Sequence, residues 1–231
     1  MKFIFVILYG ADDVVCKVEA PIYQQLHDLS ILYYEKMRLT YDMNYFYVQY
    51  RPEQEEELVE SNHHIYLKGK EEFSKIYEKT VRAIQYIHTA YPCDYIVRTN
   101  ISSFWNIPTL FTLSLPPTRC ISGILMFNWF ISGTGIIMSS DMGDLLVKEE
   151  PHHCPDCDDV FISRKLVHYA PMHLLSASMM YYLTDDPQNV HNVIPENKND
   201  ILYFRIKNGQ NRHRDVELFK ILLRDMYDIR A

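Results

Sequence analysis

The sequence predicts an α/β fold in which a mixed, mostly parallel sheet is flanked by helices. Residues 2–10 form a continuous β-branched and aromatic run that ends at Gly10, as in a central strand buried on both faces. Residues 94–100 form a second buried run. Between them, apolar residues recur at helical spacing over 71–90, on a face that carries Phe73, Ile76 and Ile87. Strands that alternate with helices in this way are typical of an open sheet.

The other elements follow in chain order. Pro21 begins a predicted helix with one apolar face, formed by Ile22, Leu26, Leu29 and Leu32. Strands are predicted at 41–51 and 63–69, with a solvated acidic run at 53–57 between them. Residues 120–147 predict two strands and then a helix from about residue 139, and a further helix covers 158–168. A strand at 201–207 precedes a closing helix at 215–227.

Composition limits the class of protein. The chain has 231 residues, of which 48% are hydrophobic and 23% charged, as in a soluble globular protein. Its net charge of −7 argues against a broad nucleic-acid-binding face. Five irregularly spaced cysteines do not predict a disulfide framework, so we expect a reducing, cytoplasmic compartment. The apolar run at 3–8 is too short for a membrane span or a signal peptide.

Two adjacent acids, Asp158 and Asp159, stand directly before an apolar run. They can supply a general base, or they can stabilise the N-terminus of the helix that follows, and the residues themselves leave both interpretations open. The glycine-punctuated segment 130–140 precedes them. Such a segment suggests a place where the backbone must approach something bulky and flat.

Cationic side chains occur at two further places. Arg98 lies in a predicted central strand and is followed by polar residues, which favours phosphate or carboxylate recognition over an internal salt bridge. The segment 203–215 is either a diphosphate-binding segment or a solvated loop. Its basic residues are Arg205, Lys207, Arg212, His213 and Arg214.

The segment 152–157 contains two histidines and a single CxxC pair, Cys154 and Cys157. One such pair is a weak signal for zinc, so a loop beside the site is the favoured interpretation. The sequence contains no phosphate-loop, dinucleotide-fingerprint, zinc-protease or serine-hydrolase motif.

Taken in order, these segments resemble the GT-A class of sugar-nucleotide-dependent glycosyltransferases, in particular its fringe-like and β-1,3-galactosyltransferase-like branch. The matching segments are Lys79-Thr80 on a helix, the strand region 94–104, the glycine-containing strand 132–141 and the acidic motif 158–160. The resemblance covers most of residues 1–215. The sequence is also similar in style to small glycosyltransferases of large DNA viruses, which would place it in the host cytoplasm.

The resemblance implies a single GT-A-like domain. Its Rossmann-like nucleotide-sugar-binding half would be 1–104, and its acceptor and catalytic half 105–231. It makes Asp159 the catalytic base and puts Asp158 in the preceding acidic position. The wall of the donor-sugar and acceptor site would be Ser132, Gly133, Thr134 and Gly135. Residues expected to contact the nucleotide are Tyr9, Gly10, Ala11 and Lys79.

One motif departs from the family. Its DxD metal motif falls here on Asn100, Ile101 and Ser102. Neutral side chains are poorer ligands than carboxylates for Mg²⁺ or Mn²⁺. Either a metal binds weakly through Asn100 and Ser102 with the help of the donor's phosphates, or it has been dispensed with. The second alternative is favoured, and protein cations would then stabilise the leaving diphosphate. Those cations would be Arg98, Lys207, Arg212 and His213.

We therefore predict an inverting hexosyltransferase. It would move a sugar from a UDP- or GDP-type donor to a hydroxyl of a glycan or glycoprotein acceptor. The alternative is a non-catalytic nucleotide-sugar or glycan-binding module that has lost the DxD motif. A zinc-stabilised interaction domain built around Cys154 and Cys157 is a third and weaker hypothesis.

Overall fold

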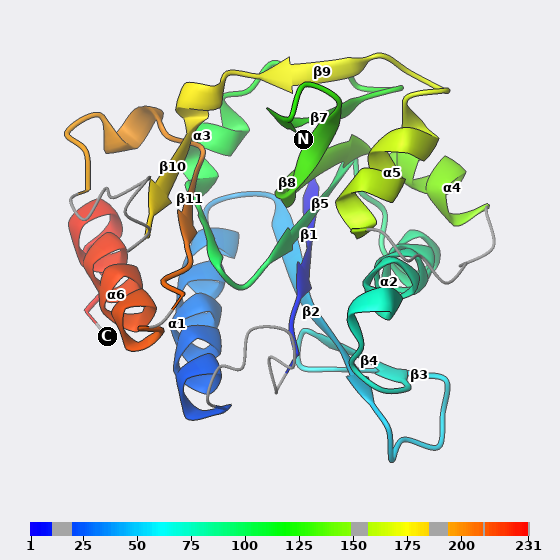
Figure 1. The fold of residues 1–231 in the computed structure, drawn as a ribbon, viewed down its shortest axis with the longest axis horizontal. Helices are drawn as coiled ribbons and strands as arrows, with labels where there is room; N and C mark the ends of the chain where they lie inside the picture. The colour runs from blue at the N-terminus through cyan, green and yellow to red at the C-terminus, as the bar shows by residue number, and fades with distance from the viewer. Residues whose placement is uncertain (11–19, 149–156, 185–193, 210, 231) are drawn as a thin grey trace. The chain divides into compact units, whose positions relative to one another are not determined.

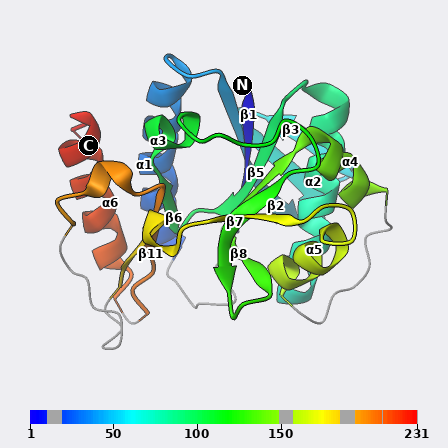
Figure 2. The same cartoon turned by 90° about the horizontal axis from the view of Figure 1, so that it is seen from above.

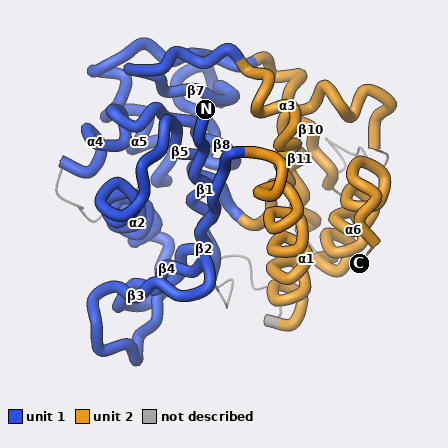
Figure 3. Tube along the Cα trace, turned by 180° about the vertical axis from the view of Figure 1, so that it is seen from behind, with its two compact units in different colours: residues 1–10, 42–100, 114–175 blue, residues 11–41, 101–113, 176–231 orange. Residues whose placement is uncertain are grey.

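A computed structural model describes residues 1–10, 20–148, 157–184, 194–209 and 211–230. The chain divides into two compact units (Figure 3). Unit 1 comprises residues 1–10, 42–100 and 114–175, and unit 2 comprises residues 11–41, 101–113 and 176–231. Each unit takes segments from both predicted halves, so the assignment of donor binding to 1–104 and of catalysis to 105–231 stays a prediction.

Unit 1 is built on an eight-stranded mixed sheet (Figure 1). Four neighbouring strands, β4, β2, β1 and β5, run parallel, as do β7 and β9, whereas β3 and β8 are antiparallel to their neighbours. In spatial order the strands are β3 (Leu58–Ser61), β4 (His64–Lys68), β2 (Met43–Arg51), β1 (Phe3–Leu8), β5 (Tyr95–Asn100), β8 (Phe130–Ser139), β7 (Ile121–Met126) and β9 (Met172–Leu175).

The middle strands of this sheet are apolar because they are covered on both faces. All six residues of β1 are buried, as the sequence predicts for a central strand. Alternate residues of β1, from Ile4 to Leu8, belong to one apolar cluster with Ile84, Leu146 and Ile162 of the neighbouring helices. That cluster joins the sheet to its helical layer.

Three helices form that layer, and Figure 2 shows them gathered beside the sheet. They are α2 (Ile76–Ala90), α4 (Ser140–Val147) and α5 (Asp158–Leu166). The prediction of one helix over 71–90 needs a correction at its start. Residues Phe73–Lys75 form a separate 3₁₀ turn, η1, and Phe73 is therefore 45% exposed rather than buried on the helix face. The α-helix then buries Ile84 and Ile87 as expected.

Unit 2 combines a three-stranded sheet with helices. Strand β11 (Tyr203–Ile206) lies between β10 (Met180–Leu183), which is parallel to it, and β6 (Ser103–Trp105), which is antiparallel. Its helical elements are α1 (Ala20–Arg38), α3 (Ile107–Phe111), η2 (Ala177–Met179), η3 (Lys198–Asp200) and α6 (His213–Tyr227). Helices α1 and α6 pack against each other.

One prediction for unit 2 is wrong in detail. Leu32, predicted on the buried face of α1, is 43% exposed, whereas the next residue, Tyr33, is buried. The Tyr33 ring stacks on Phe104 and its hydroxyl donates to the Trp105 carbonyl oxygen at 2.6 Å, which fixes the face that α1 turns inward. The buried strand predicted at 94–100 is confirmed as β5, but the region 94–104 matched in the family resemblance is not one continuous strand. β5 ends at Asn100, and the Ser102 carbonyl oxygen already accepts the Ile206 N–H of β11 at 2.8 Å.

Among the helices that the structure describes, none is both long and apolar enough to cross a bilayer.

Candidate active site

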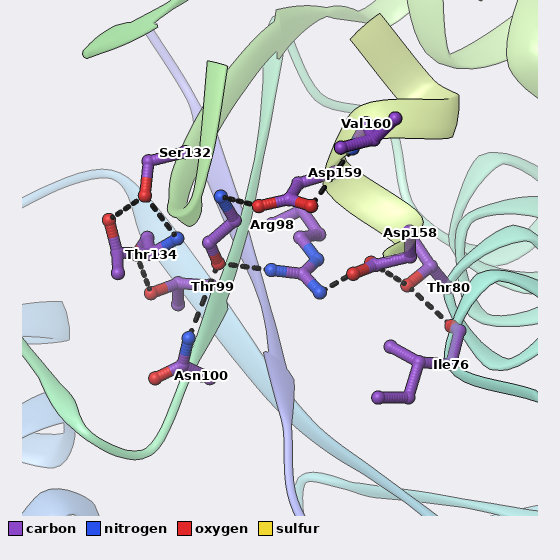
Figure 4. A network of polar contacts seen from close by, with 11 residues as sticks. Ile76, Thr80, Arg98, Thr99, Asn100, Ser132, Thr134, Asp158, Asp159 and Val160 are labelled. Atoms are coloured by element: carbon purple, nitrogen blue, oxygen red, sulfur yellow. Dashed lines mark hydrogen bonds and ion pairs between the residues drawn. The ribbon is translucent and has the colours of Figure 1, made fainter. Parts of the chain in front are cut away.

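A buried ion pair joins the sheet of unit 1 to α5. Arg98 of β5 forms a salt bridge with Asp158, the first residue of α5, and both side chains are buried. Arg98 also donates to the Gly133 carbonyl oxygen, and Thr80 of α2 donates to Asp158 Oδ2 at 3.4 Å (Figure 4). Both terminal nitrogens of the Arg98 guanidinium are thus directed at protein groups. This geometry favours the internal salt bridge over direct phosphate recognition by Arg98.

The environment of Asp158 is that of a structural acid. Burial raises the pKa of Asp158 above its ordinary value, and the adjacent Arg98 guanidinium opposes that rise. A buried carboxylate needs such a partner because an isolated charge in the interior is strongly unfavourable. The ion pair therefore contributes no net charge to its surroundings.

Asp159, the second residue of α5, is placed differently. It is half-buried, and its two carboxylate oxygens accept separate backbone N–H groups. Oδ2 accepts from Gly133 at 2.7 Å, and Oδ1 accepts from Val160 at 2.9 Å (Figure 4). A carboxylate offers about four acceptor positions, so two bonds fix its orientation and leave capacity for a proton. Of the two acids, Asp159 is the one that solvent can reach.

The glycine-rich segment of β8 brings the backbone to these side chains. Gly123 of β7 pairs with Ile136, and Leu125 pairs with Ile131, so four residues of β8 (132–135) lie opposite one residue of β7. Bulges of this kind bend a strand and are frequent beside active sites. A Cβ atom at Gly133 would lie 2.8 Å from Arg98 Nη1 and 2.9 Å from Asp159 Oδ2. The flat group that the backbone approaches is the guanidinium of Arg98.

Hydroxyl groups line the same bulge. Ser132 Oγ and Thr134 Oγ1 lie 2.8 Å apart, and Thr99 Oγ1 donates to the Thr134 carbonyl oxygen at 2.7 Å (Figure 4). The structure thus gathers the predicted wall residues Ser132–Gly135 beside Asp159. Their contact with a sugar stays a prediction.

Two of the predicted nucleotide-binding residues meet at the end of β1. Lys79 Nζ donates to the Tyr9 carbonyl oxygen at 3.2 Å and to both Glu71 carboxylate oxygens, at 2.9 and 2.7 Å. Burial lowers the pKa of Lys79, and the charge of Glu71 opposes that shift. The hydrogen bonds of the Lys79 ammonium thus go to protein groups, and one of them fixes the backbone at Tyr9. Gly10 follows Tyr9, and Ala11 lies outside the described residues.

The residues at the metal-motif positions do not suit a divalent cation. Asn100 uses its amide to donate to the Gly133 carbonyl oxygen at 3.3 Å. Ser102 Oγ, in unit 2, accepts from Arg212 Nη2 at 3.1 Å, so a cation on that oxygen would face a buried guanidinium. Over the described ranges, no three His, Cys, Asp or Glu side chains form a metal-binding cluster. The CxxC prediction falls mostly on 149–156, outside those ranges, and Cys157 is exposed.

The basic residues of unit 2 separate into two kinds. Lys207 and His213 are exposed, whereas Arg212 is buried and its Nε lies 2.9 Å from Asp215 Oδ2. Arg212 Nη1 has no hydrogen-bond partner within the described part of the chain. Burial lowers the pKa of the nearby Arg205, and the charge of Arg212 lowers it further. The charge of Asp215 opposes the fall in the pKa of Arg205.

Comparison with known proteins bears on the fold. No known protein family and no curated protein matches the sequence. Among solved structures, the chain is similar to a glycosyltransferase involved in the glycosylation of the major capsid of PBCV-1. The TM-score is 0.55 at 13% sequence identity, over 94% of this chain and 98% of that one. The predicted fold class is confirmed.

A second similar structure is that of the galactosyltransferase LgtC in complex with donor and acceptor sugar analogues. It is 9% identical over 95% of each chain, with a TM-score of 0.49. At identities this low the similarity establishes the fold alone, and the reaction must be argued from the site.

Proposed function

We propose that this chain is a glycosyltransferase. It moves a sugar from a nucleotide-diphosphate sugar to an acceptor hydroxyl and inverts the anomeric centre, with Asp159 as the base. The observation that carries the proposal is the charge balance in unit 1. Arg98 and Asp158 neutralise each other in the interior, whereas the half-buried Asp159 carboxylate is held by backbone N–H groups. A carboxylate so placed suits proton abstraction.

In this mechanism Asp159 takes the proton of the acceptor hydroxyl while the oxygen attacks the anomeric carbon from the face opposite the diphosphate. The bond from that carbon to the diphosphate oxygen breaks, and the nucleoside diphosphate leaves with the electron pair. An oriented base of this kind contributes roughly 10²–10⁴-fold to the rate. Arg98 acts as a positioning residue, because it holds the Gly133 carbonyl while the Gly133 N–H holds Asp159.

No step of this mechanism uses a metal, because the side chains of Asn100 and Ser102 are poor ligands for a divalent cation. Positive charge for the leaving diphosphate is instead assigned to Lys207, Arg212 and His213. The buried Arg212 guanidinium supports that assignment, because its Nη1 has no hydrogen-bond partner among the described residues. The donor is proposed to be of the UDP or GDP type, and the acceptor a glycan or glycoprotein. Membership of the fringe-like branch and a large DNA virus as source belong to the same proposal.

A donor screen tests the reaction itself. UDP-, GDP- and TDP-sugars are incubated with the protein in EDTA and, separately, in Mn²⁺, and release of nucleoside diphosphate is measured. Calorimetry records binding in the same buffers. Turnover in EDTA with at least one donor is the expected result. Binding without turnover in every condition would instead establish the non-catalytic binding module.

Replacing the base tests its identity. D159N should retain donor affinity within about twofold and lose transfer by roughly 10²–10⁴-fold, since the proton acceptor is removed. D141N is the matched control. Asp141 also lies in the first turn of a helix and accepts a backbone N–H, from Arg119 at 2.9 Å. Transfer by D159N at the rate of D141N would refute the role of Asp159.

A further inference from the structure

The hairpin that joins β7 to β8 presents two large aromatic side chains to solvent. Phe127 is 79% exposed and Trp129 is 44% exposed. Phe127 and Asn128 have positive φ values of 47° and 63°, and the Trp129 N–H closes the turn on the Met126 carbonyl oxygen at 3.1 Å. Two-residue turns of this geometry favour Asn and Gly, and a bulky aromatic at positive φ is strained. This strained turn leaves the Phe127 ring exposed to solvent.

Other side chains hold these rings in place. The Arg164 guanidinium of α5 lies 5.0 Å from the centroid of the Trp129 ring. The buried Phe130 contacts both neighbours, with centroid distances of 4.8 Å to Trp129 and 6.1 Å to Phe127. The aromatic tip, Phe127 and Trp129, is thus preorganised before any ligand binds, which lowers the entropic cost of binding.

The aromatic tip shares its two supporting elements with Asp159. Strand β8 and helix α5 run side by side and contact each other at three levels. Gly133 bonds to Asp159, the Ile131 N–H donates to Ser163 Oγ at 3.0 Å, and Trp129 meets Arg164. From residue 159 to residue 164 the helix rises about 7.5 Å, at about 1.5 Å per residue. The aromatic tip therefore lies beside the same helix as Asp159, next to a residue more than one helical turn further along it.

We propose that Phe127 and Trp129 form an acceptor subsite that stacks on a pyranose ring, next along the glycan from the ring with the reacting hydroxyl. The proposal rests on the proposed function. One face of a pyranose carries C–H groups and stacks on aromatic rings, while the hydroxyl groups at its rim suit a guanidinium donor such as Arg164. A bilayer is the less favoured occupant, because the net charge of −7 opposes binding to anionic lipids.

Trp129 supplies its own reporter, because the other tryptophan, Trp105, is fully buried. Disaccharides of glucose, galactose and mannose, and the matching methyl monoglycosides, are titrated without donor while tryptophan emission and acrylamide quenching are recorded. At least one disaccharide should change the emission and protect it from the quencher, and the change should be absent in W129A. Because no donor is present, this titration tests the subsite even if transfer fails.

Kinetics supply the second arm. W129A and F127A should raise KM for disaccharide acceptors roughly tenfold, a loss typical of one aromatic stacking contact, and leave donor KM and monosaccharide KM unchanged. W129F should recover most of the affinity. F73A is the matched control, because Phe73 is 45% exposed at a different place in unit 1.

Two results would overturn the subsite. One is a full panel of disaccharides that leaves Trp129 emission unchanged, together with wild-type acceptor KM in W129A; the transferase proposal would survive it. The other is co-sedimentation of the wild type, but not of W129A, with vesicles of phosphatidylcholine and phosphatidylserine, which would assign the tip to a membrane surface.

Discussion

Asp158 and Asp159 are adjacent, yet removing the charge of Asp158 should destabilise the fold more than removing the charge of Asp159. In D158N the buried Arg98 guanidinium loses its partner. Breaking one side of a buried pair costs about 3–5 kcal/mol, because the remaining charge is left uncompensated. In D159N the new amide keeps one acceptor oxygen for one of the two N–H groups, and a single unmet backbone donor costs about 1–3 kcal/mol.

Urea unfolding followed by circular dichroism measures both values, with R98M and R98M/D158N completing a double-mutant cycle. The double variant should be less destabilised than the sum of the two single variants, by about 1–3 kcal/mol, because neither residue is then a lone buried charge. Equal losses in D158N and D159N, or strict additivity of R98M and D158N, would refute the division into a structural acid and a reachable one.

Two further variants test the surroundings of these acids. G133A should lose about 1–3 kcal/mol of unfolding free energy and most of the transfer rate, since its Cβ would lie 2.8 Å from Arg98 Nη1. G209A is the control, because its Cβ would meet no atom of the described residues within 4 Å. Both variants are measured by urea unfolding and donor turnover, and equal effects would contradict the account of the bulge. Burial lowers the pKa of His88 from its ordinary 6.5, so the unfolded chain takes up this proton first and stability falls as the pH drops below about 6.5. Urea midpoints between about pH 7.5 and 5 should therefore fall more steeply in the wild type than in H88Q, and parallel curves would exclude this contribution.

Much of the fold can be predicted because a strand that is buried on both faces has a continuous run of apolar residues. The run that becomes β1 contains no polar residue, and its order relative to α2 and β5 is enough to suggest an open sheet. The local sequence pattern does not predict which residue faces inward where a contact with a residue far along the chain determines it. Tyr33 replaces Leu32 on the inner face of α1 because its hydroxyl reaches the Trp105 carbonyl, 72 residues away. The helical spacing of apolar residues gives no sign of this long-range hydrogen bond.

The site shows the same limit. The sequence singles out Asp158 and Asp159 because two acids precede an apolar run, but it cannot say which one is neutralised. That depends on Arg98, which is 60 residues from Asp158, and on Thr80, which is 78 residues away. The sequence does not single out Glu71, the partner of Lys79, either. Its only signal is that a lysine on the apolar face of an amphipathic helix needs an acid nearby.

The bulge explains why two such different acids are neighbours. Helix α5 begins at Asp158, so its first side chain enters the interior and its second lies at the boundary with solvent. Gly133 touches both systems, because its carbonyl oxygen accepts from Arg98 and its N–H donates to Asp159. The backbone at Gly133 therefore links the buried, neutral pair of Arg98 and Asp158 to the half-buried Asp159 carboxylate and fixes the position of that carboxylate. The pair contributes orientation without contributing charge, and that combination suits the proposed role of Asp159 as a base.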